Sequence, residues 1–348
     1  MKYRQLGRSG LRVSRICLGT MVGFDKDNQQ EATRVIHEAV DLGVNFIDTA
    51  DCYGQAEEVL GEALREGGRR PKVVLATKGA WRTGGGPNDY GASRAHLIQA
   101  CENSLRKLRT DFIDLYYLHV VDPNTPMDET LRVLDVLIQQ GKVRYIGTSK
   151  HPVALIMEAL ALSDRLGLER FVAEQSPYNL LDRRAENDLV WMGLRQGIGI
   201  TPYAPLAAGM LSGKYGLDGS AKEGGRFAGV KPGASQIFTG AALQAAADLR
   251  AIAQAKGISL AEMSLAWLMH QPAVAAPVVG ARTVEYLRSA AKACDVTFAP
   301  DELARIDEIV PPGGYVSDFY GANVHAPLRT NYKAGTKGGA FIPNNRLS

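Results

Sequence analysis

Short runs rich in β-branched and apolar residues recur along the chain and alternate with segments of helical periodicity. This alternation is typical of βα units, whose strands pair in parallel. Eight runs have this character, at residues 16–20, 45–50, 73–79, 113–120, 143–149, 172–178, 199–204 and 276–280. Eight such units in a chain of 348 residues favour a closed (β/α)8 TIM barrel over a doubly wound sheet.

Helical segments fill the intervals between these runs. Residues 28–42 place Ala32, Val35, Ile36 and Ala39 three or four positions apart, which gives one apolar face for packing on a sheet. Comparable patterns, several opening with Ser, Asp or Pro, occur at residues 93–108, 128–140, 152–166 and 182–196, and a last helix is predicted at 300–310. We therefore expect helices to cover the outside of the barrel.

The two ends of the chain lack the alternation of strands and helices seen in its centre. Residues 2–6 and 11–15 alternate polar and apolar side chains around a Gly-containing turn, which predicts a β-hairpin. We interpret residues 1–348 as a single domain, with the hairpin at 1–15, the barrel at 16–310 and a tail at 311–348. The tail is rich in Gly, Pro and Asn, and three interpretations stay open: it covers the barrel rim, packs on a partner subunit or is disordered.

Two long insertions, residues 81–91 and 207–238, follow the third and seventh predicted strands. The carboxyl ends of the strands form the catalytic rim of such barrels, so we expect these insertions to be lids or specificity walls. They carry the aromatic residues Trp81, Tyr90 and Phe238. These side chains predict an apolar, ring-sized substrate site, suited to a bulky cyclic ketone or a sugar-like carbonyl compound.

Charge and cysteine usage exclude several classes of protein. The 40 Lys and Arg are interspersed with 37 Asp and Glu, so nothing predicts binding to nucleic acid or to a membrane. No run approaches the roughly 18 apolar residues that cross a bilayer, and residues 1–10 lack a secretion signal, which favours a cytoplasmic protein. Four scattered cysteines favour reduced thiols over disulfides or a zinc site, and no metal is expected.

Polar side chains stand at the ends of successive predicted strands. Asp48 closes the second run, Lys78 the third and His119 the fourth, while Tyr53 follows Asp48 by five residues. A barrel brings side chains from successive strand ends into one site, whatever their separation in sequence. We therefore expect these four residues to lie together.

Their chemistry follows from their pKa values. A phenol with a pKa near ~10 is a poor acid at neutral pH, but a neighbouring ammonium lowers that value and a carboxylate keeps the ammonium charged. Tyr53 would then deliver a proton, and His119 would donate a hydrogen bond to the same oxygen. The set lacks a reductant, so its natural complement is hydride from a bound nicotinamide. The Gly-rich fingerprint of a Rossmann unit is absent after the first strand, so a nucleotide would bind in another way.

Five motifs occur in the order typical of one family: residues 46–54 (FIDTADCYG), 77–78 (TK), 114–119 (DLYYLH), 141–149 (GKVRYIGTS) and 175–179 (QSPYN). On these motifs the chain resembles an aldo-keto reductase from the hairpin to residue 310. The resemblance implies a (β/α)8 barrel that uses NADPH/NADP+, with NADH less favoured. It also implies that Tyr53 is the general acid of a catalytic tetrad completed by Asp48, Lys78 and His119.

The resemblance further implies where the cofactor binds. Tyr203 would stack on the nicotinamide, Ser149 and Gln175 would hold its carboxamide, and Lys150 replaces an Asn common in relatives and adds a cation. Backbone amides of residues 205–214 would cradle the pyrophosphate, and Arg282 would meet the 2'-phosphate. The full set of implied contacts is Gly19, Thr20, Ser149, Lys150, Gln175, Tyr203, Pro205, Leu206, Gly209, Leu211, Ser212, Lys214, Gly280, Arg282 and Tyr286.

Together these observations predict an NADPH-dependent oxidoreductase that reduces an aldehyde or ketone reversibly, as a monomer or homo-oligomer. Two alternatives stay open. The same barrel resembles potassium-channel β subunits, so a nucleotide-binding regulatory subunit with slow turnover is the main one. A lyase that binds no nicotinamide is the other.

Overall fold

The computed structural model describes residues 1–221 and 225–321, and at its centre lies an eight-stranded parallel sheet. The strands follow the order β10-β3-β4-β5-β6-β7-β8-β9. Their bounds are β3 (Cys17–Gly19), β4 (Phe46–Asp48), β5 (Val74–Gly79), β6 (Ile113–Leu118), β7 (Val143–Ser149), β8 (Phe171–Gln175), β9 (Gly199–Ile200) and β10 (Val278–Val279). Each strand coincides with one of the eight predicted runs, although β8 begins one residue earlier than predicted.

The sheet closes on itself between its first and last strands. The Ile200 N–H donates to the Ala273 carbonyl at 3.0 Å, and the Ile200 carbonyl accepts from the Ala275 N–H at 2.8 Å. Three residues further on, the Val278 N–H donates to the Pro202 carbonyl at 2.8 Å. These bonds join β9 to the segment that leads into β10, which confirms the (β/α)8 barrel.

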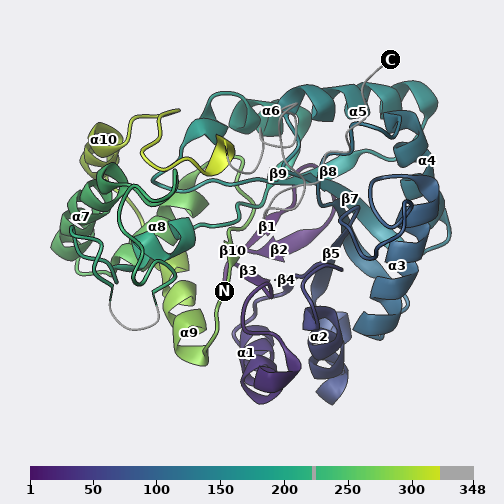
Figure 1. The fold of residues 1–348 in the computed structure, drawn as a ribbon, viewed down its shortest axis with the longest axis horizontal. Coiled ribbons are helices and arrows are strands. Elements are labelled where there is room, and N and C mark those ends of the chain that lie inside the picture. The colour runs from purple at the N-terminus through teal and green to yellow at the C-terminus, as the bar shows by residue number, and fades with distance from the viewer. Residues whose placement is uncertain (222–224, 322–348) are drawn as a thin grey trace.

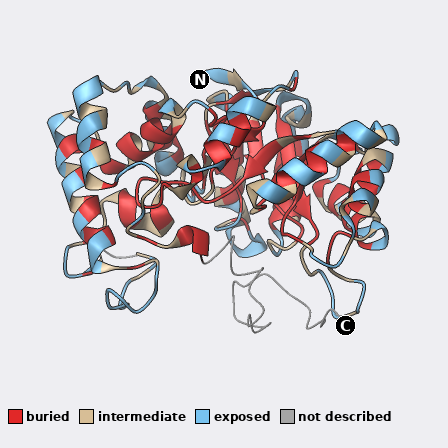
Figure 2. Ribbon diagram, turned by 90° about the horizontal axis from the view of Figure 1, so that it is seen from above, coloured by how far each residue is buried: buried red, intermediate tan, exposed pale blue. Residues whose placement is uncertain are grey.

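Ten α-helices occur in the described part of the chain, and they surround the strands (Figure 1). They are α1 (Gln29–Asp41), α2 (Ala56–Arg65), α3 (Arg94–Leu108), α4 (Met127–Gln139), α5 (Val153–Leu166), α6 (Leu189–Gln196), α7 (Gly240–Ala255), α8 (Leu260–His270), α9 (Val284–Lys292) and α10 (Pro300–Ile309). Figure 2 shows the inward faces buried and the outward faces exposed, as amphipathic periodicity requires. Both α7 and α8 lie between β9 and β10. The sequence interpretation gave bounds for neither of them, nor for α2 and α9.

The predicted helix at residues 182–196 is wrong in its first half. The helix α6 begins only at Leu189. The buried Asp182 carboxylate pairs with the Arg184 guanidinium and accepts the backbone N–H groups of Phe319 and Tyr320 at 2.8 and 3.0 Å. Because both oxygens serve these partners, Asp182 is not the helix cap that its residue type suggested.

The amino-terminal hairpin is confirmed, with β1 (Tyr3–Gln5) antiparallel to β2 (Arg12–Ser14). Leu6 and Val13 are fully buried against residues inside the barrel, among them Phe46, Leu115 and Ala173. These contacts place the hairpin against the amino-terminal ends of the strands, opposite the rim that carries the polar residues.

Backbone strain concentrates at the carboxyl ends of the strands. Ala80 (φ +75°), Lys150 (φ +62°) and Ala204 (φ +52°) adopt left-handed conformations close behind β5, β7 and β9. Residues other than glycine rarely adopt a positive φ, and those that do cluster at functional sites. The distribution marks this rim as the functional face.

The start of the tail packs beside β8. The Val316 N–H donates to the Leu181 carbonyl at 3.0 Å, and the Arg183 N–H donates to the Gly314 carbonyl at 2.9 Å. This part of the tail therefore packs on the chain that follows β8. The rest of the predicted tail, residues 322–348, lies outside the described residues. None of the helices that the structure describes is both long and apolar enough to cross a membrane.

Candidate active site

The structure brings together the four residues predicted as a tetrad. The Lys78 ammonium, at the end of β5, donates to Asp48 Oδ2 of β4 at 2.6 Å and to the Thr49 carbonyl at 2.8 Å. The same Nζ atom lies 3.5 Å from the Tyr53 phenol oxygen. Lys78 is fully buried, and the cation between acid and phenol that the sequence required is therefore present.

Burial and charge act in opposite directions on these groups. Burial by itself lowers the pKa of Lys78, but the Asp48 carboxylate and then Tyr53 and Cys52 together raise it above its usual value, so the ammonium stays charged. For Tyr53, burial raises the pKa to about 12 although Lys78 pulls it down. The prediction of a lowered Tyr53 pKa is wrong in its net direction, because desolvation of the phenolate exceeds the effect of one ammonium. Tyr53 is therefore fully protonated at neutral pH.

His119 follows β6 and faces the same phenol. Its ring centroid lies 5.7 Å from that of Tyr53 and 5.2 Å from that of Trp81. Burial, and then the charges of Lys150 and Lys78, hold the pKa of His119 well below its usual range. A neutral imidazole keeps one N–H, which suits a hydrogen-bond donor to a substrate oxygen.

The two residues expected to hold a nicotinamide carboxamide lie beside the tetrad. Gln175 Nε2 donates to Asp48 Oδ1 at 3.0 Å, and Ser149 Oγ donates to the Gln175 carbonyl at 2.8 Å. Gly19 and Thr20 lie on the other side of Asp48, at the end of β3. The Thr20 N–H donates to the Asp48 carbonyl at 3.0 Å. Strands β3, β4, β7 and β8 thus all contribute predicted residues to one rim.

The segment after β9 holds the other expected cofactor residues. Tyr203 pairs with Ser176 through its backbone, and its buried phenol oxygen has no hydrogen-bond partner among the described residues. The short helix η5 (Ala207–Ser212) follows Pro205 and Leu206. Its amides are only partly available as the predicted phosphate cradle, because the N–H groups of Gly209 and Leu211 both donate to the Leu206 carbonyl.

A second cluster suits a phosphate group. Lys214 Nζ lies 2.9 Å from the Tyr286 phenol oxygen, and the hydrogen bond from Lys214 lowers the Tyr286 pKa. Arg282 also contributes to that lowering, so both cations lie near the same ring. Neither Lys214 nor Arg282 forms an ion pair with a carboxylate of the described residues. Gly280 lies just after β10 and leads into this cluster.

The rim loops contribute fewer aromatic side chains to the site than predicted. Trp81 contacts His119, but Phe238 is fully buried, and its ring stacks on Phe227 at 4.5 Å between centroids. The Arg82 guanidinium lies over the Tyr90 ring. Phe238 therefore belongs to the core of its own loop, and the prediction that it lines the substrate site is wrong.

Asp51 is a residue that the sequence interpretation missed. Its carboxylate is buried, neither oxygen has a hydrogen-bond partner among the described residues, and burial raises its pKa to about 8. Ligand atoms of Asp51, Cys52 and His119 lie within 4.8 Å of one another, a spacing that could hold a metal ion. The nearby ammonium groups of Lys78 and Lys150 oppose a bound cation. Its position two residues before Tyr53 is the sequence signal that could have identified Asp51 as a site residue.

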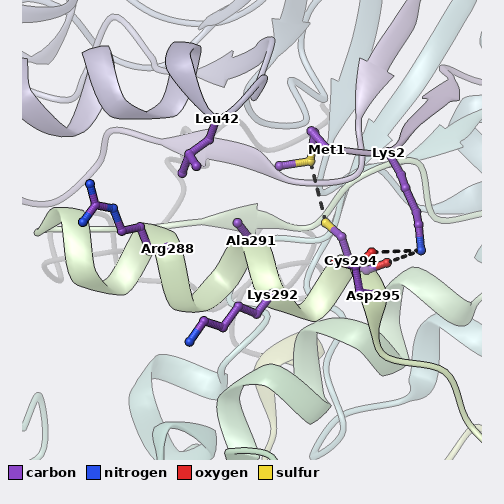
Figure 3. A pocket seen from close by; sticks show the side chains of 8 residues that line it. All are labelled: Met1, Lys2, Leu42, Arg288, Ala291, Lys292, Cys294 and Asp295. Atoms are coloured by element: carbon purple, nitrogen blue, oxygen red, sulfur yellow. Dashed lines mark hydrogen bonds and ion pairs between the residues drawn. The ribbon is translucent and has the colours of Figure 1, made fainter.

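Figure 3 shows a separate pocket. It has a volume of about 350 Å³ and is lined by Met1, Lys2, Leu42, Arg288, Ala291, Lys292, Cys294 and Asp295. Leu42 precedes β4, so the pocket opens near the amino-terminal ends of the strands. None of the predicted site residues belongs to it.

Comparison with known proteins identifies a family and several relatives of this chain. The family model described as the aldo/keto reductase family matches residues 15–311. A probable voltage-gated potassium channel subunit beta from Arabidopsis thaliana is 36% identical over 319 residues, which cover 89% of this chain and 97% of that protein. An uncharacterized oxidoreductase, YrpG, from Bacillus subtilis is 36% identical over 334 residues, 92% of this chain and 99% of its own. The L-glyceraldehyde 3-phosphate reductase of Escherichia coli K12 is 33% identical over 328 residues, 90% of this chain and 93% of the relative.

Proposed function

The chain belongs to the aldo/keto reductase family, and we propose that it is an NADPH-dependent reductase of an aldehyde or ketone. The observation that carries this proposal is the buried array in which Lys78 lies between Asp48 and Tyr53, with His119 facing the same phenol. Two relatives are named as an oxidoreductase and as a reductase of a phosphorylated aldehyde, which supports the same reaction class.

The four residues supply the proton half of a carbonyl reduction. The substrate oxygen accepts hydrogen bonds from the Tyr53 phenol and from the neutral His119 imidazole. As negative charge develops on that oxygen, the Tyr53 proton moves to it, since an alkoxide is far more basic than a phenolate. The Lys78 ammonium stabilises the phenolate that remains, and Asp48 holds Lys78 in place. In the opposite direction the same phenolate removes the alcohol proton.

The residues that would hold NADPH suit its 2'-phosphate and its nicotinamide. Lys214 and Arg282 have no carboxylate partner among the described residues, and together they suit the 2'-phosphate that distinguishes NADPH from NADH. Gln175, which donates to Asp48, and Ser149, which donates to Gln175, would contact the nicotinamide, and Tyr203 would stack on it. When bound, the reduced cofactor supplies the hydride that the side chains cannot.

The test is a substrate panel with the full chain, followed at the nicotinamide absorbance band with NADPH and with NADH. Tyr53→Phe should lower kcat by about 10²–10⁴-fold, because the proton donor is lost while the ring remains. Binding of NADPH, measured by fluorescence titration, should stay unchanged. The matched control is Tyr3→Phe, which removes an exposed phenol on the hairpin and should keep full activity. If Tyr53→Phe turns over as fast as the control, the proposal fails.

A second candidate function rests on the relatives named as potassium channel β subunits. On this alternative the chain would bind NADPH and a channel protein, and it would turn over slowly. Rapid multiple turnover of NADPH with a small carbonyl compound separates the two, since a regulatory subunit would release product slowly. The complete tetrad favours the enzyme.

A further inference from the structure

We propose that Lys150 binds an acidic group of the substrate, so that the preferred carbonyl compound carries a carboxylate or phosphate close to its carbonyl carbon. This inference rests on the proposed reductase function and specifies its substrate class. It also reassigns Lys150, which the sequence placed among the cofactor contacts.

The first argument is position. Lys150 directly follows Ser149, the last residue of β7, and its backbone is anchored by an N–H bond to the Gln175 carbonyl at 3.0 Å. Its φ of +62° is one that lysine rarely adopts, so this side chain is presented at the rim at a conformational cost. Strained residues that persist at a functional rim are candidates for a role in function.

The second argument is the identity of its neighbours. The Lys150 ammonium lies 5.0 Å from the centre of the Trp81 ring, and that ring lies 5.2 Å from His119. The charge of Lys150 also acts on Cys52, next to Tyr53. These neighbours follow β4, β5 and β6, and they surround the proton donor. None of these three side chains is assigned to the nucleotide, although the Lys150 backbone adjoins Ser149 and Gln175, which would contact the nicotinamide.

The third argument is the missing counter-charge. Lys78 is paired with Asp48, but no carboxylate of the described residues lies within ion-pair distance of the Lys150 ammonium. Among residues 1–221 and 225–321, this half-buried ammonium lies on an aromatic face and feels the charge of Glu174 but forms no ion pair, and an acidic substrate would supply that partner.

Burial lowers the pKa of Lys150 to about 8, so the group is still largely charged at neutral pH. The same charge lowers the pKa of His119, which keeps the imidazole neutral beside the carbonyl oxygen. Lys150 thus makes the substrate side of the site electropositive without taking part in proton transfer. An anionic substrate is favoured there over a neutral compound of the same length.

The experiment compares matched substrate pairs at saturating NADPH, with the full chain. The carboxylate pair is 4-oxobutanoate and butanal, and the phosphate pair is glycolaldehyde phosphate and glycolaldehyde. The variants are Lys150→Met, which removes the charge but keeps the length, and Lys150→Arg, which keeps the charge. The control is Lys142→Met, which alters a lysine paired with Glu102 at the opposite end of β7.

We expect Lys150→Met to lower kcat/KM for the charged members by about 10- to 100-fold, mainly through KM, as loss of a charged hydrogen bond predicts. The neutral members should change less than about threefold, and Lys150→Arg should retain most of the preference. The substrate pair whose charged member loses more kcat/KM shows whether Lys150 favours a carboxylate or a phosphate.

Three results would overturn the inference. One is an equal loss for charged and neutral substrates, which indicates a structural role. Another is a rise in the KM of NADPH alone, which returns Lys150 to the cofactor. The third is a wild-type enzyme that reduces all four compounds without preference. A wild type that consumes NADPH with none of them contradicts the proposed function itself, so the two failures are distinct.

Discussion

Replacing Asp48 by Asn tests the buried ion pair at the centre of the site. The substitution keeps the shape and removes one charge, so the fully buried Lys78 ammonium loses a partner at 2.6 Å. Breaking a buried pair by removing one partner costs about 3–5 kcal/mol of unfolding free energy, because an uncompensated charge remains. Without the carboxylate, burial favours the neutral amine of Lys78, and the phenolate formed at Tyr53 loses its stabilising charge. We therefore also expect kcat to fall by about 10²–10³-fold.

The stability assay is equilibrium urea unfolding, and the activity assay is single-turnover oxidation of NADPH. The matched control is Asp164→Asn, which breaks an ion pair with Arg170 at 2.5 Å. The Asp164 side chain is 61% exposed. Solvent screens this pair, so its loss should cost no more than about 1 kcal/mol and leave kcat unchanged.

The double variant Asp48→Asn/Lys78→Met removes both buried charges and separates stability from catalysis. It should recover much of the lost stability, since a neutral replacement of a buried pair is often tolerated, but it should stay inactive. The reasoning is refuted if Asp48→Asn costs no more stability than Asp164→Asn, or if the double variant is less stable than Asp48→Asn.

Two further predictions concern proton transfer and packing. Because the pKa of Tyr53 is raised to about 12, the phenol keeps its proton, so kcat for reduction of a neutral aldehyde should stay constant between about pH 6 and 10. Alcohol oxidation needs the phenolate and should become faster as pH rises in the same interval; a reduction rate that falls above about pH 8 would contradict this assignment. In α2, a Cβ at Gly61 would lie 2.6 Å from the Leu108 carbonyl of α3, so Gly61→Ala should destabilise the fold by about 1–3 kcal/mol in urea unfolding. Gly10→Ala, which meets no atom within 4 Å, is its control and should leave the midpoint unchanged.

The sequence predicted the barrel because each strand carries its own signal. A buried β-strand is a local apolar run, and the alternation with helices fixes parallel pairing. The positions of Asp48, Lys78 and His119 at strand ends then follow from topology alone, since the carboxyl ends of parallel strands share one rim. That is why the tetrad could be placed before any distance was known.

The errors come from contacts and burial that the sequence pattern does not express. Asp182 looked like a helix cap, but its partners Phe319 and Tyr320 lie more than 130 residues away. Phe238 looked like a substrate contact, but Phe227 and Tyr215 bury it within the loop. The net pKa of Tyr53 depends on desolvation, which no spacing in the sequence expresses.

The arginines of the hairpin have a consequence for how this chain folds as it is synthesised. Arg15 donates to the carbonyls of Val274 and Ala275, and Arg4 donates to that of Val274, across 259 and 270 positions of sequence. These carbonyls belong to the segment that closes the barrel. These guanidinium groups, which are synthesised before the barrel, therefore lack their carbonyl partners until residues near 275 have been made. Closure of so long a loop is slow. We expect the nascent chain to stay open, and to depend on chaperones, until that segment has been made.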